Sequence, residues 1–274
     1  MTETIELSIV IVNWNTRDLL RDCLAALRAA DLPQSMETIV VDNGSTDGSI
    51  AMVAADFPAV ELIANDCNVG YSRGNNQALY RARGGYVLLL NSDTRVSRQA
   101  IRTLMRFMDA HPDAGACAPR LVAANNIAQP FAYGGEPTLA YLFRRGVFRC
   151  VLRQGLHDWD RSGAQEVDWA SGACLLVRRE VVESVGPLDE SLFMYFEDVD
   201  WCLRMRKLGW RVFVQPEAVV THLGGGSLRQ NPEARRCYYQ SLRVFYAKHY
   251  GRLAQALMET GLWLYRRINP IEDG

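Results

Sequence analysis

The sequence predicts an α/β protein built on a largely parallel sheet flanked by helices, and three observations support this class. Short runs of β-branched and other apolar residues recur through the first half of the 274-residue chain. Each run ends in a polar loop, and each loop opens a stretch whose apolar residues have helical spacing. Strand-helix units in succession are typical of parallel strands joined by right-handed crossovers.

Four strand-helix units are expected in this half. The strands are predicted at residues 7–12, 38–41, 60–64 and 86–90. The first is continuously apolar, as expected of a strand buried on both faces. The helices are predicted after Thr16, after the turn at 43–48, after 68–70 and after Ser97, which we expect to cap the fourth helix.

The second half has a different texture. Residues 123–168 are irregular and include a basic, apolar stretch at 142–153. Further strands are expected at 174–177, 210–214 and 219–222, a helix from the acidic segment 197–200 to Gly209, and a flexible loop at 224–226. From residue 232 to about 268 the pattern is helical, aromatic-rich and basic.

Composition favours an ordinary folded protein. The chain is 49% hydrophobic and 22% charged with a net charge of −1, so no global field favours nucleic acid as a partner. The 7 cysteines are scattered and contain no Cys-x-x-Cys pair, which favours a reduced, cytoplasmic protein. The N-terminus does not resemble a secretory signal, and no stretch is long and uncharged enough to span a bilayer.

Polar residues follow the predicted strands at the edge where parallel sheets bind ligands. Asn13, Asp42 and Asp93 each follow a strand. Asp93 could bind a hard cation that bridges two phosphates, with water or phosphate as further ligands. A helix cap or Asx turn before Ser97 explains the same residue.

Asp42 and Arg73 have side chains that suit contact with a nucleotide. Asp42 could accept a hydrogen bond from a base or a ribose hydroxyl, and Arg73 beside a glycine-rich turn suits a diphosphate or a base carbonyl. A plain surface arginine fits Arg73 equally well. The chain lacks Gly-x-Gly-x-x-Gly after its first strand and lacks a P-loop, so neither common phosphate-binding motif applies.

Three carboxylates open one predicted helix, where the helix dipole tolerates negative charge. They are Glu197, Asp198 and Asp200. Capping explains one or two of them, but the neighbouring aromatic residues indicate a partly buried carboxylate with a raised pKa. We therefore predict a catalytic carboxylate in this segment.

His222 follows a short apolar strand and precedes three glycines, so its imidazole could face a cleft beside a mobile loop. A lone histidine is usually structural. Its interpretation as a metal ligand depends on Asp93 lying nearby.

Six motifs, taken in order, resemble those of the family 2 glycosyltransferases, particularly the rhamnosyltransferase-like branch. They lie at residues 10–15, 40–48, 68–76, 88–93, 171–174 and 196–204. The resemblance covers nearly all of residues 5 to 225. It implies a GT-A fold, a nucleoside-diphosphate-sugar donor, an inverting mechanism and a divalent metal, Mg²⁺ or Mn²⁺.

The resemblance also assigns roles to particular residues. It implies that Asp42 reads the base, Asn91 contacts the ribose, Asp93 binds the metal, His222 adds a second metal contact and Asp198 is the general base. The chain departs from many family members in having Asn91 where they have aspartate, which leaves one carboxylate fewer around the metal.

We expect one GT-A domain over residues 1–226, followed by a C-terminal helical extension over 227–274 that matches nothing known to us. Within the domain, residues 1–120 form a nucleotide-binding half and residues 121–226 an acceptor-binding half. Asn13 and Arg73 complete the expected nucleotide contacts. Trp169 and Glu197 are the expected acceptor contacts.

The predicted reaction is transfer of a hexose, with dTDP-rhamnose or a UDP-sugar as donor, in the synthesis of cell-surface polysaccharide. The acceptor is expected to be a glycan or a lipid-linked sugar. Arginines alternate with apolar residues at 142–153, and the C-terminal helix adds more, which suits peripheral contact with the inner face of a membrane. A solvated face or a homodimer contact explains the same pattern.

Two other classes of protein remain open from sequence. A sugar-phosphate nucleotidyltransferase also has a parallel nucleotide-binding sheet, but it would need a glycine-rich basic loop where this chain has residues 13–16. A nucleotide-sugar-binding protein with an inactive site is the alternative that is not an enzyme.

Overall fold

The computed structural model describes residues 5–30, 35–150, 159, 162–224 and 232–268. Within these residues, one large sheet has the strand order β3-β2-β1-β4-β10-β6-β11-β5, and β8 pairs with β11 outside this path. Strands β7 and β9 form a separate small ladder.

The N-terminal half contains the four predicted strand-helix units. Its elements are β1 (Leu7–Asn13), α1 (Arg17–Ala29), β2 (Met36–Asp42), α2 (Ser49–Asp56), β3 (Glu61–Ala64), α3 (Tyr71–Leu79), β4 (Tyr86–Asn91), β5 (Thr94–Arg95) and α4 (Arg98–Ala110). Strands β3, β2, β1 and β4 are parallel, as predicted. The register aligns Asn13 with Asp42 and Val12 with Asn91, so the carboxyl ends of these strands meet at one edge.

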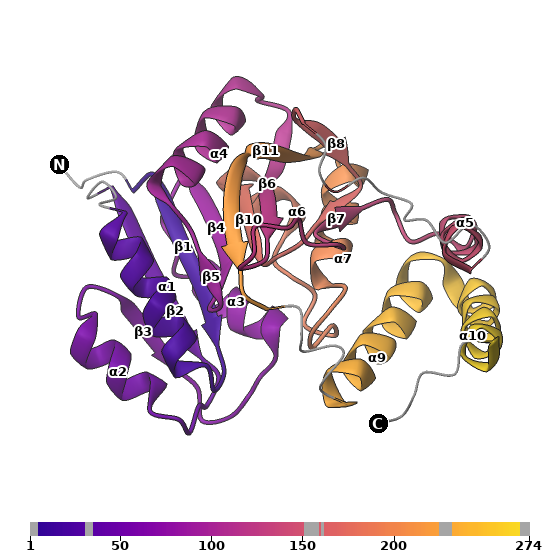
Figure 1. Ribbon diagram of the computed structural model, residues 1–274, viewed down its shortest axis with the longest axis horizontal. Helices are drawn as coiled ribbons and strands as arrows, with labels where there is room; N and C mark the ends of the chain where they lie inside the picture. The colour runs from indigo at the N-terminus through magenta and orange to yellow at the C-terminus, as the bar shows by residue number, and fades with distance from the viewer. Residues whose placement is uncertain (1–4, 31–34, 151–158, 160–161, 225–231, 269–274) are drawn as a thin grey trace.

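Local sequence explains these elements. The buried residues of β1 and β4 are apolar along nearly the whole strand because helices cover both faces of a parallel sheet. Helices α1 and α2 lie over strands β1 to β3 in Figure 1. Ser97 caps α4 as predicted, since its hydroxyl accepts a hydrogen bond from the amide of Ala100 at 3.1 Å.

The second half continues the same sheet but reverses the direction of some strands. Its elements are β6 (Ala114–Val122), β7 (Tyr133–Gly134), α5 (Leu139–Cys150), β8 (Gln165–Val167), β9 (Trp169–Ala170), β10 (Cys174–Arg178), α6 (Arg179–Val185), α7 (Glu197–Lys207) and β11 (Arg211–His222). Strand β10 runs antiparallel to both β4 and β6, whereas β11 is parallel to β6. The sheet is therefore largely, not wholly, parallel.

Two expectations for this half need correction. The strands expected at 210–214 and 219–222 are one strand, β11, whose register shifts between Gln215 and Val219. Strand β6 and helix α5 arise in sequence that had no assigned element. The alanines, Gly115 and Pro119 of β6 carry a weak strand signal, and this strand is specified by its burial between neighbours.

The C-terminal extension is a pair of helices, α9 (Pro232–His249) and α10 (Gly251–Ile268), at the right of Figure 1 beside α5. Gly251 turns the chain between them with a φ of +80°, a conformation that favours glycine. A second apolar cluster, which includes Leu203, Phe245 and Met258, packs the extension against α7. The expected domain boundary at residue 226 lies outside the described residues.

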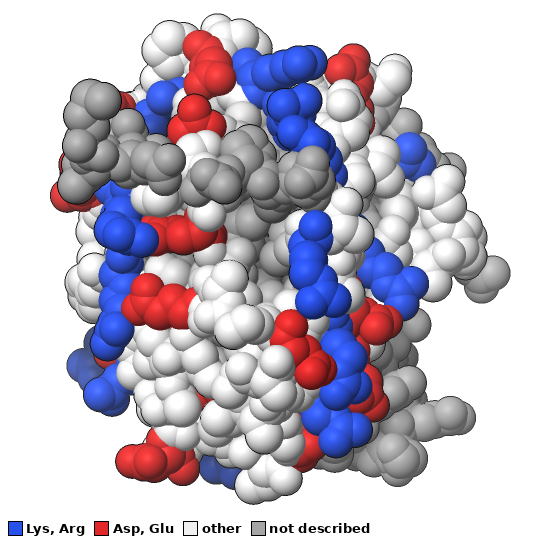
Figure 2. Space-filling model, turned by 90° about the vertical axis from the view of Figure 1, so that its left-hand side faces the viewer, with Lys and Arg blue, Asp and Glu red and all other residues white. Residues whose placement is uncertain are grey.

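Surface charge is mixed where it can be seen. Figure 2 shows acidic and basic side chains interspersed over the described part of the face formed by the N-terminal half. Among the residues that the structure describes, no helix has the length and apolar content needed to cross a membrane.

Candidate active site

The ends of β1 and β2 form a buried polar corner. Asn13 donates to Asp42 Oδ2 at 2.8 Å, and the amide of Ser45 donates to Asp42 Oδ1 at 2.7 Å. The hydroxyl of Thr16 donates to Asn13 Oδ1 at 2.6 Å. The side chains of Asn13 and Asp42 are almost inaccessible to solvent. The turn after β2 therefore holds the Asp42 carboxylate rigidly at the sheet edge.

The ends of β4 and β11 bring three predicted residues together. Thr94 pairs with His222 across β5 and β11, and this pairing sets Asp93 against the histidine. The Nε2 atom of His222 lies 3.1 Å from Asp93 Oδ1 and 3.4 Å from Asn91 Nδ2. The predicted metal ligands, which are far apart in sequence, thus lie side by side.

Gly224 forms one wall of this group. A Cβ atom at Gly224 would overlap Asp93 Oδ2 and lie 3.0 Å from His222 Nε2. Any larger residue would fill the space beside the carboxylate.

Asp93 and His222 suit a divalent cation whose remaining ligands come from the substrate and from water. Within the described chain, no group of three or more His, Cys, Asp or Glu side chains could hold a metal alone. Asp93 and His222 offer one oxygen and one nitrogen, and both remain partly exposed. Diphosphate oxygens and water would have to complete the coordination, which is the usual arrangement for Mg²⁺.

Tyr71, at the start of α3, connects this group to the rest of the site. Its hydroxyl lies 3.1 Å from Asn91 Oδ1 and 2.9 Å from the carbonyl oxygen of Gly172, and it can donate to one of them at a time. Burial is the main cause that raises the pKa of Tyr71 well above its ordinary value, and the carboxyl groups of Glu197 and Asp198 add to the rise wherever they are ionised. The hydroxyl therefore stays a neutral donor. Sequence reasoning missed this residue; its aromatic hydroxyl within the glycine-rich turn was the available signal.

Asp198 lies on the other side of Gly172. The amide of Gly172 donates to Asp198 Oδ2 at 3.0 Å, and the amide of Val199 donates to Oδ1 at 2.8 Å. Burial raises the pKa of Asp198, and these two hydrogen bonds partly oppose the rise. A line of contacts thus runs from the predicted metal ligands through Tyr71 to the predicted base.

Glu197 is more deeply buried than its neighbour, with 6% of its surface exposed. Burial and then the charge of Asp198 raise the pKa of Glu197 well above its ordinary value. Its Oε2 atom has no hydrogen-bond partner among the described residues. The protonated form of Glu197 is therefore favoured beside the carboxyl group of Asp198.

The turn before α7 is strained. Tyr195 and Phe196 have φ values of 70° and 67°, a backbone conformation that residues other than glycine rarely adopt. Packing of Phe196 against Phe245 and Tyr238 holds this turn in place. Strained backbone of this kind is concentrated at functional sites, and here it directs the first turn of α7.

Asp200 has a different environment from Glu197 and Asp198. It is fully buried and accepts hydrogen bonds from Arg204, Lys248 and His249 at about 2.7 Å each. Burial alone would raise the pKa of Asp200, but the hydrogen bonds of His249 and Lys248 and the charge of Arg204 outweigh it and lower the pKa. This carboxylate is ionised at neutral pH, and its partners are basic side chains that hold α7 and α9 together.

Trp169 and Arg73 lie at the margins. The indole nitrogen of Trp169 donates to the carbonyl oxygen of Gly135 at 3.0 Å, and its ring packs against both apolar clusters. Arg73 is exposed on α3 with its Nε 3.9 Å from Glu190 Oε2. Within the described residues, no hydrogen bond or ion pair joins Arg73 to the group formed by Asn91, Asp93 and His222.

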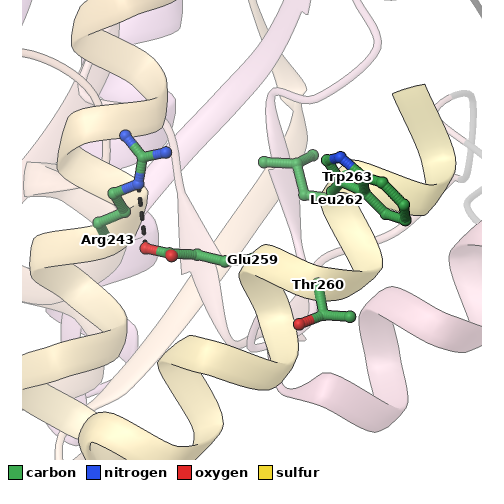
Figure 3. Close-up of a pocket in the computed structure, with 5 residues that line it drawn as sticks. All are labelled: Arg243, Glu259, Thr260, Leu262 and Trp263. Carbon is green, nitrogen blue, oxygen red and sulfur yellow. Dashed lines mark hydrogen bonds and ion pairs between the residues drawn. The ribbon is translucent and has the colours of Figure 1, made fainter. Parts of the chain in front are cut away.

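One further hollow, of about 540 Å³, lies in the C-terminal extension. Figure 3 shows its lining on α9 and α10, where Arg243 forms a 3.0 Å ion pair with Glu259. Thr260, Leu262 and Trp263 complete the lining. None of the predicted site residues contributes to it.

Comparison with known proteins agrees with this architecture. The chain is similar to the Pyrobaculum calidifontis mannosyltransferase PcManGT, solved in complex with GDP-Man and Mn²⁺, with a TM-score of 0.58 and 18% identity over 97% of this chain and 83% of that one. The fold is therefore the GT-A fold of glycosyltransferases.

Comparison of sequences shows to which family of glycosyltransferases the chain belongs. Residues 8–186 match the family model described as Glycosyl transferase family 2. The chain is 30% identical, over 89% of its length and 85% of the relative, to an N-acetylglucosaminyl-diphospho-decaprenol L-rhamnosyltransferase of Mycobacterium tuberculosis. It is 26% identical, over 79% of its length and 68% of the relative, to the dTDP-rhamnosyl transferase RfbF of Shigella flexneri. The chain belongs to glycosyltransferase family 2.

Proposed function

We propose that this glycosyltransferase is metal-dependent and inverting, and that it moves a sugar from a nucleoside-diphosphate donor to a hydroxyl acceptor. The observation that carries the proposal is the line of contacts from Asp93 and His222 through Asn91, Tyr71 and Gly172 to Asp198. This arrangement would place a cation beside the leaving group, on one side of Tyr71. It would place a base beside the acceptor, on the other side of Tyr71.

Asp93 and His222 are the proposed ligands of Mn²⁺ or Mg²⁺. When bound, such an ion supplies positive charge to the departing diphosphate. Asn91 is the proposed ribose contact, and the hydroxyl of Tyr71 orients its amide. Asp42, supported by Asn13, is the proposed contact to the base of the nucleotide.

Asp198 is the proposed general base. Its carboxylate would take the proton of the acceptor hydroxyl while that oxygen attacks the anomeric carbon opposite the diphosphate, which inverts the configuration. A diphosphate with its charge balanced needs no acid to leave, so one carboxylate suffices, whereas a glycosidase needs two. Glu197, whose raised pKa favours its protonated form, could donate a hydrogen bond to a hydroxyl group of the acceptor, and Trp169 is the second proposed acceptor contact.

The donor is proposed to be dTDP-rhamnose, with UDP-sugars as the second choice, and the product to be a cell-surface polysaccharide. The rhamnosyltransferase activities of the mycobacterial and Shigella relatives support rhamnose, and the mycobacterial relative also supports a lipid-linked acceptor. Arg73 remains a proposed diphosphate contact that would have to leave Glu190 to reach the nucleotide.

Family membership favours this function over a sugar-phosphate nucleotidyltransferase. Donor hydrolysis, measured with metal and without acceptor, separates it from an inactive binding protein. A thermal-shift panel of nucleotide sugars with Mn²⁺ or Mg²⁺ identifies the donor, because a ligand that binds only the folded state raises the melting temperature. We expect dTDP-rhamnose to give the largest rise; no rise and no hydrolysis with any donor would refute the proposal.

Contact with an anionic membrane surface is a further part of the proposal, and it now rests on α10. Leu253, Leu257 and Leu264 are 77%, 54% and 48% exposed, and their spacing places them on one side of the helix. Exposed Arg252 and Arg267 flank this side, and Arg267 stacks on Trp263 at 4.2 Å. An amphipathic helix with a basic rim suits an anionic lipid surface.

Other residues contribute less to such contact than expected. Arg243 is paired with Glu259, and Lys248 with Asp189 and Asp200, so these carboxylates compete with lipid for both residues. The last part of the predicted basic stretch, residues 151–153, lies outside the described residues. The alternative to lipid is a second copy of this chain, which would cover the exposed side of α10 in a homodimer.

A further inference from the structure

Gln129 holds His222 from the side opposite Asp93. It lies in the loop between β6 and β7, where its backbone amide donates to the carbonyl oxygen of Leu121 at 2.9 Å. Its side-chain nitrogen donates to the carbonyl oxygen of His222 at 2.7 Å and lies 3.3 Å from that of Gly224. Its side-chain oxygen lies 2.8 Å from His222 Nδ1.

These contacts decide the orientation of the amide group. A carbonyl oxygen can only accept, so the two backbone carbonyls require the nitrogen of Gln129 to face them. The oxygen of Gln129 then faces Nδ1 of His222, and an amide oxygen can only accept. Nδ1 must therefore carry the proton of the neutral imidazole.

The other imidazole nitrogen follows from this assignment. With the proton on Nδ1, Nε2 has a lone pair, and this lone pair faces Asp93 Oδ1 at 3.1 Å and the amide nitrogen of Asn91 at 3.4 Å. Two acceptors so close together repel each other unless positive charge, as a proton on Nε2 or as a metal ion, lies near both. A Cβ atom at residue 224 would overlap Asp93 Oδ2 and lie 3.0 Å from His222 Nε2, so glycine keeps a side chain away from both groups.

We propose that Gln129 is a positioning residue that fixes the Nδ1–H tautomer of His222 and so directs a bare Nε2 toward the cation. The inference rests on the proposed metal site at Asp93 and His222. Histidines that bind metals usually donate their other N–H to an acceptor, and loss of that acceptor lowers metal affinity about 10-fold to 100-fold. Gln129 also ties the backbone of residues 222–224, which bound the same space.

Two substitutions separate these roles. Gln129→Met keeps the length of the side chain but removes both its donor and its acceptor. Gln129→Glu keeps an acceptor for Nδ1–H but loses the donors to the two carbonyls. Gln99→Met is the matched control, because Gln99 is exposed on α4 and bonds only to Thr103 of the same helix among the described residues.

The first readout needs no metal. Nitrogen NMR of the 4 histidines, with the His222 signals assigned by their loss in His222→Gln, reports the tautomer once the pH has been raised until those signals stop changing. We expect Nδ1–H in the wild type, in Gln99→Met and in Gln129→Glu, and a mixture with Nε2–H in Gln129→Met. Nε2–H in the wild type, or an unchanged tautomer in Gln129→Met, would overturn the proposal.

The second readout is Mn²⁺ affinity, measured by calorimetry with a nucleoside diphosphate present. We expect about a 10-fold loss in Gln129→Met, substantial rescue in Gln129→Glu and no change in Gln99→Met. Equal losses in both Gln129 variants would assign the residue to loop structure alone and overturn the tautomer role. If the wild type binds no Mn²⁺, the metal site itself fails, and the tautomer pattern still decides the role of Gln129.

Discussion

Glu197 and Asp198 are adjacent carboxyl groups with different protonation behaviour. Burial raises the pKa of both, but the charge of Asp198 adds to the rise at Glu197, whereas two backbone amides oppose it at Asp198. We therefore expect Asp198 to ionise at a lower pH than Glu197. This ordering favours Asp198 as the group that accepts a proton near neutral pH.

We predict that Asp198→Asn lowers turnover by about 100-fold or more while donor affinity stays nearly intact, because the substitution removes basicity and keeps shape. Steady-state kinetics together with donor binding by calorimetry test this. Glu197→Gln is the matched variant and should act mainly through positioning or stability. Near-normal turnover in a folded Asp198→Asn variant would transfer the role of base to Glu197.

The pH dependence of kcat/KM should follow the raised pKa of Asp198. Below that pKa the base is protonated and inactive, so activity should rise with pH and reach half its maximum above the ordinary aspartate value of about 3.9. Burial is the main cause of the shift, so Glu197→Gln should leave this acidic limb in place. An acidic limb that moves with Glu197→Gln would assign the titration to Glu197.

At the scale of elements, Asp200 joins α7 to the C-terminal extension. It accepts hydrogen bonds from Lys248 and His249 of α9 while Arg204 contacts it from its own helix. The helix that begins with Glu197 and Asp198 is thereby attached to α9. The extension consequently supports the segment that carries the proposed base.

Asp200→Asn should lower the free energy of unfolding by about 3 kcal/mol, because three basic groups lose a buried counter-charge. Urea denaturation at neutral pH measures this, with the exposed Asp18→Asn as a control expected to change stability by less than about 0.5 kcal/mol. The lowered pKa of Asp200 gives stability that is present above its unfolded pKa and is lost as the pH falls. The difference between wild type and Asp200→Asn should therefore shrink below about pH 4, and a difference independent of pH would argue against the ion-pair explanation.

The exposed side of α10 gives a separate prediction. The protein should sediment with anionic phospholipid vesicles at low salt and not with neutral ones, and Leu257→Glu should weaken this association. Leu208→Glu, at an equally exposed leucine beyond the end of α7, should not. Failure to sediment at low salt would eliminate the membrane contact, and loss of a dimer in Leu257→Glu without any lipid binding would assign the face to a homodimer.

At the scale of the whole molecule, sequence predicts the features that have local causes. Strands β1 to β4 are recognisable because each is a nearly continuous apolar run followed by a polar turn. The places of Asp42 and Asp93 at the sheet edge follow from that order alone. The direction of β10 does not, because an antiparallel strand has the same apolar composition as a parallel one.

Contacts between distant segments were beyond sequence reasoning. Gln129 and His222 are 93 positions apart, and Tyr71 and Gly172 are 101 positions apart. No local pattern marks either pair. Arg73 shows the opposite case, since its glycine-rich surroundings suggested a ligand, whereas in the fold it faces solvent beside Glu190.

The central claim is that Asp93 and His222 bind a divalent cation together with a nucleoside diphosphate. Calorimetric titration of dTDP or UDP into the wild type and Asp93→Ala, each with and without Mn²⁺, tests it most directly. The account predicts that Mn²⁺ strengthens diphosphate binding to the wild type and that Asp93→Ala abolishes this strengthening while residual nucleotide binding at Asp42 persists. Unchanged metal-dependent affinity in a folded Asp93→Ala variant would contradict it.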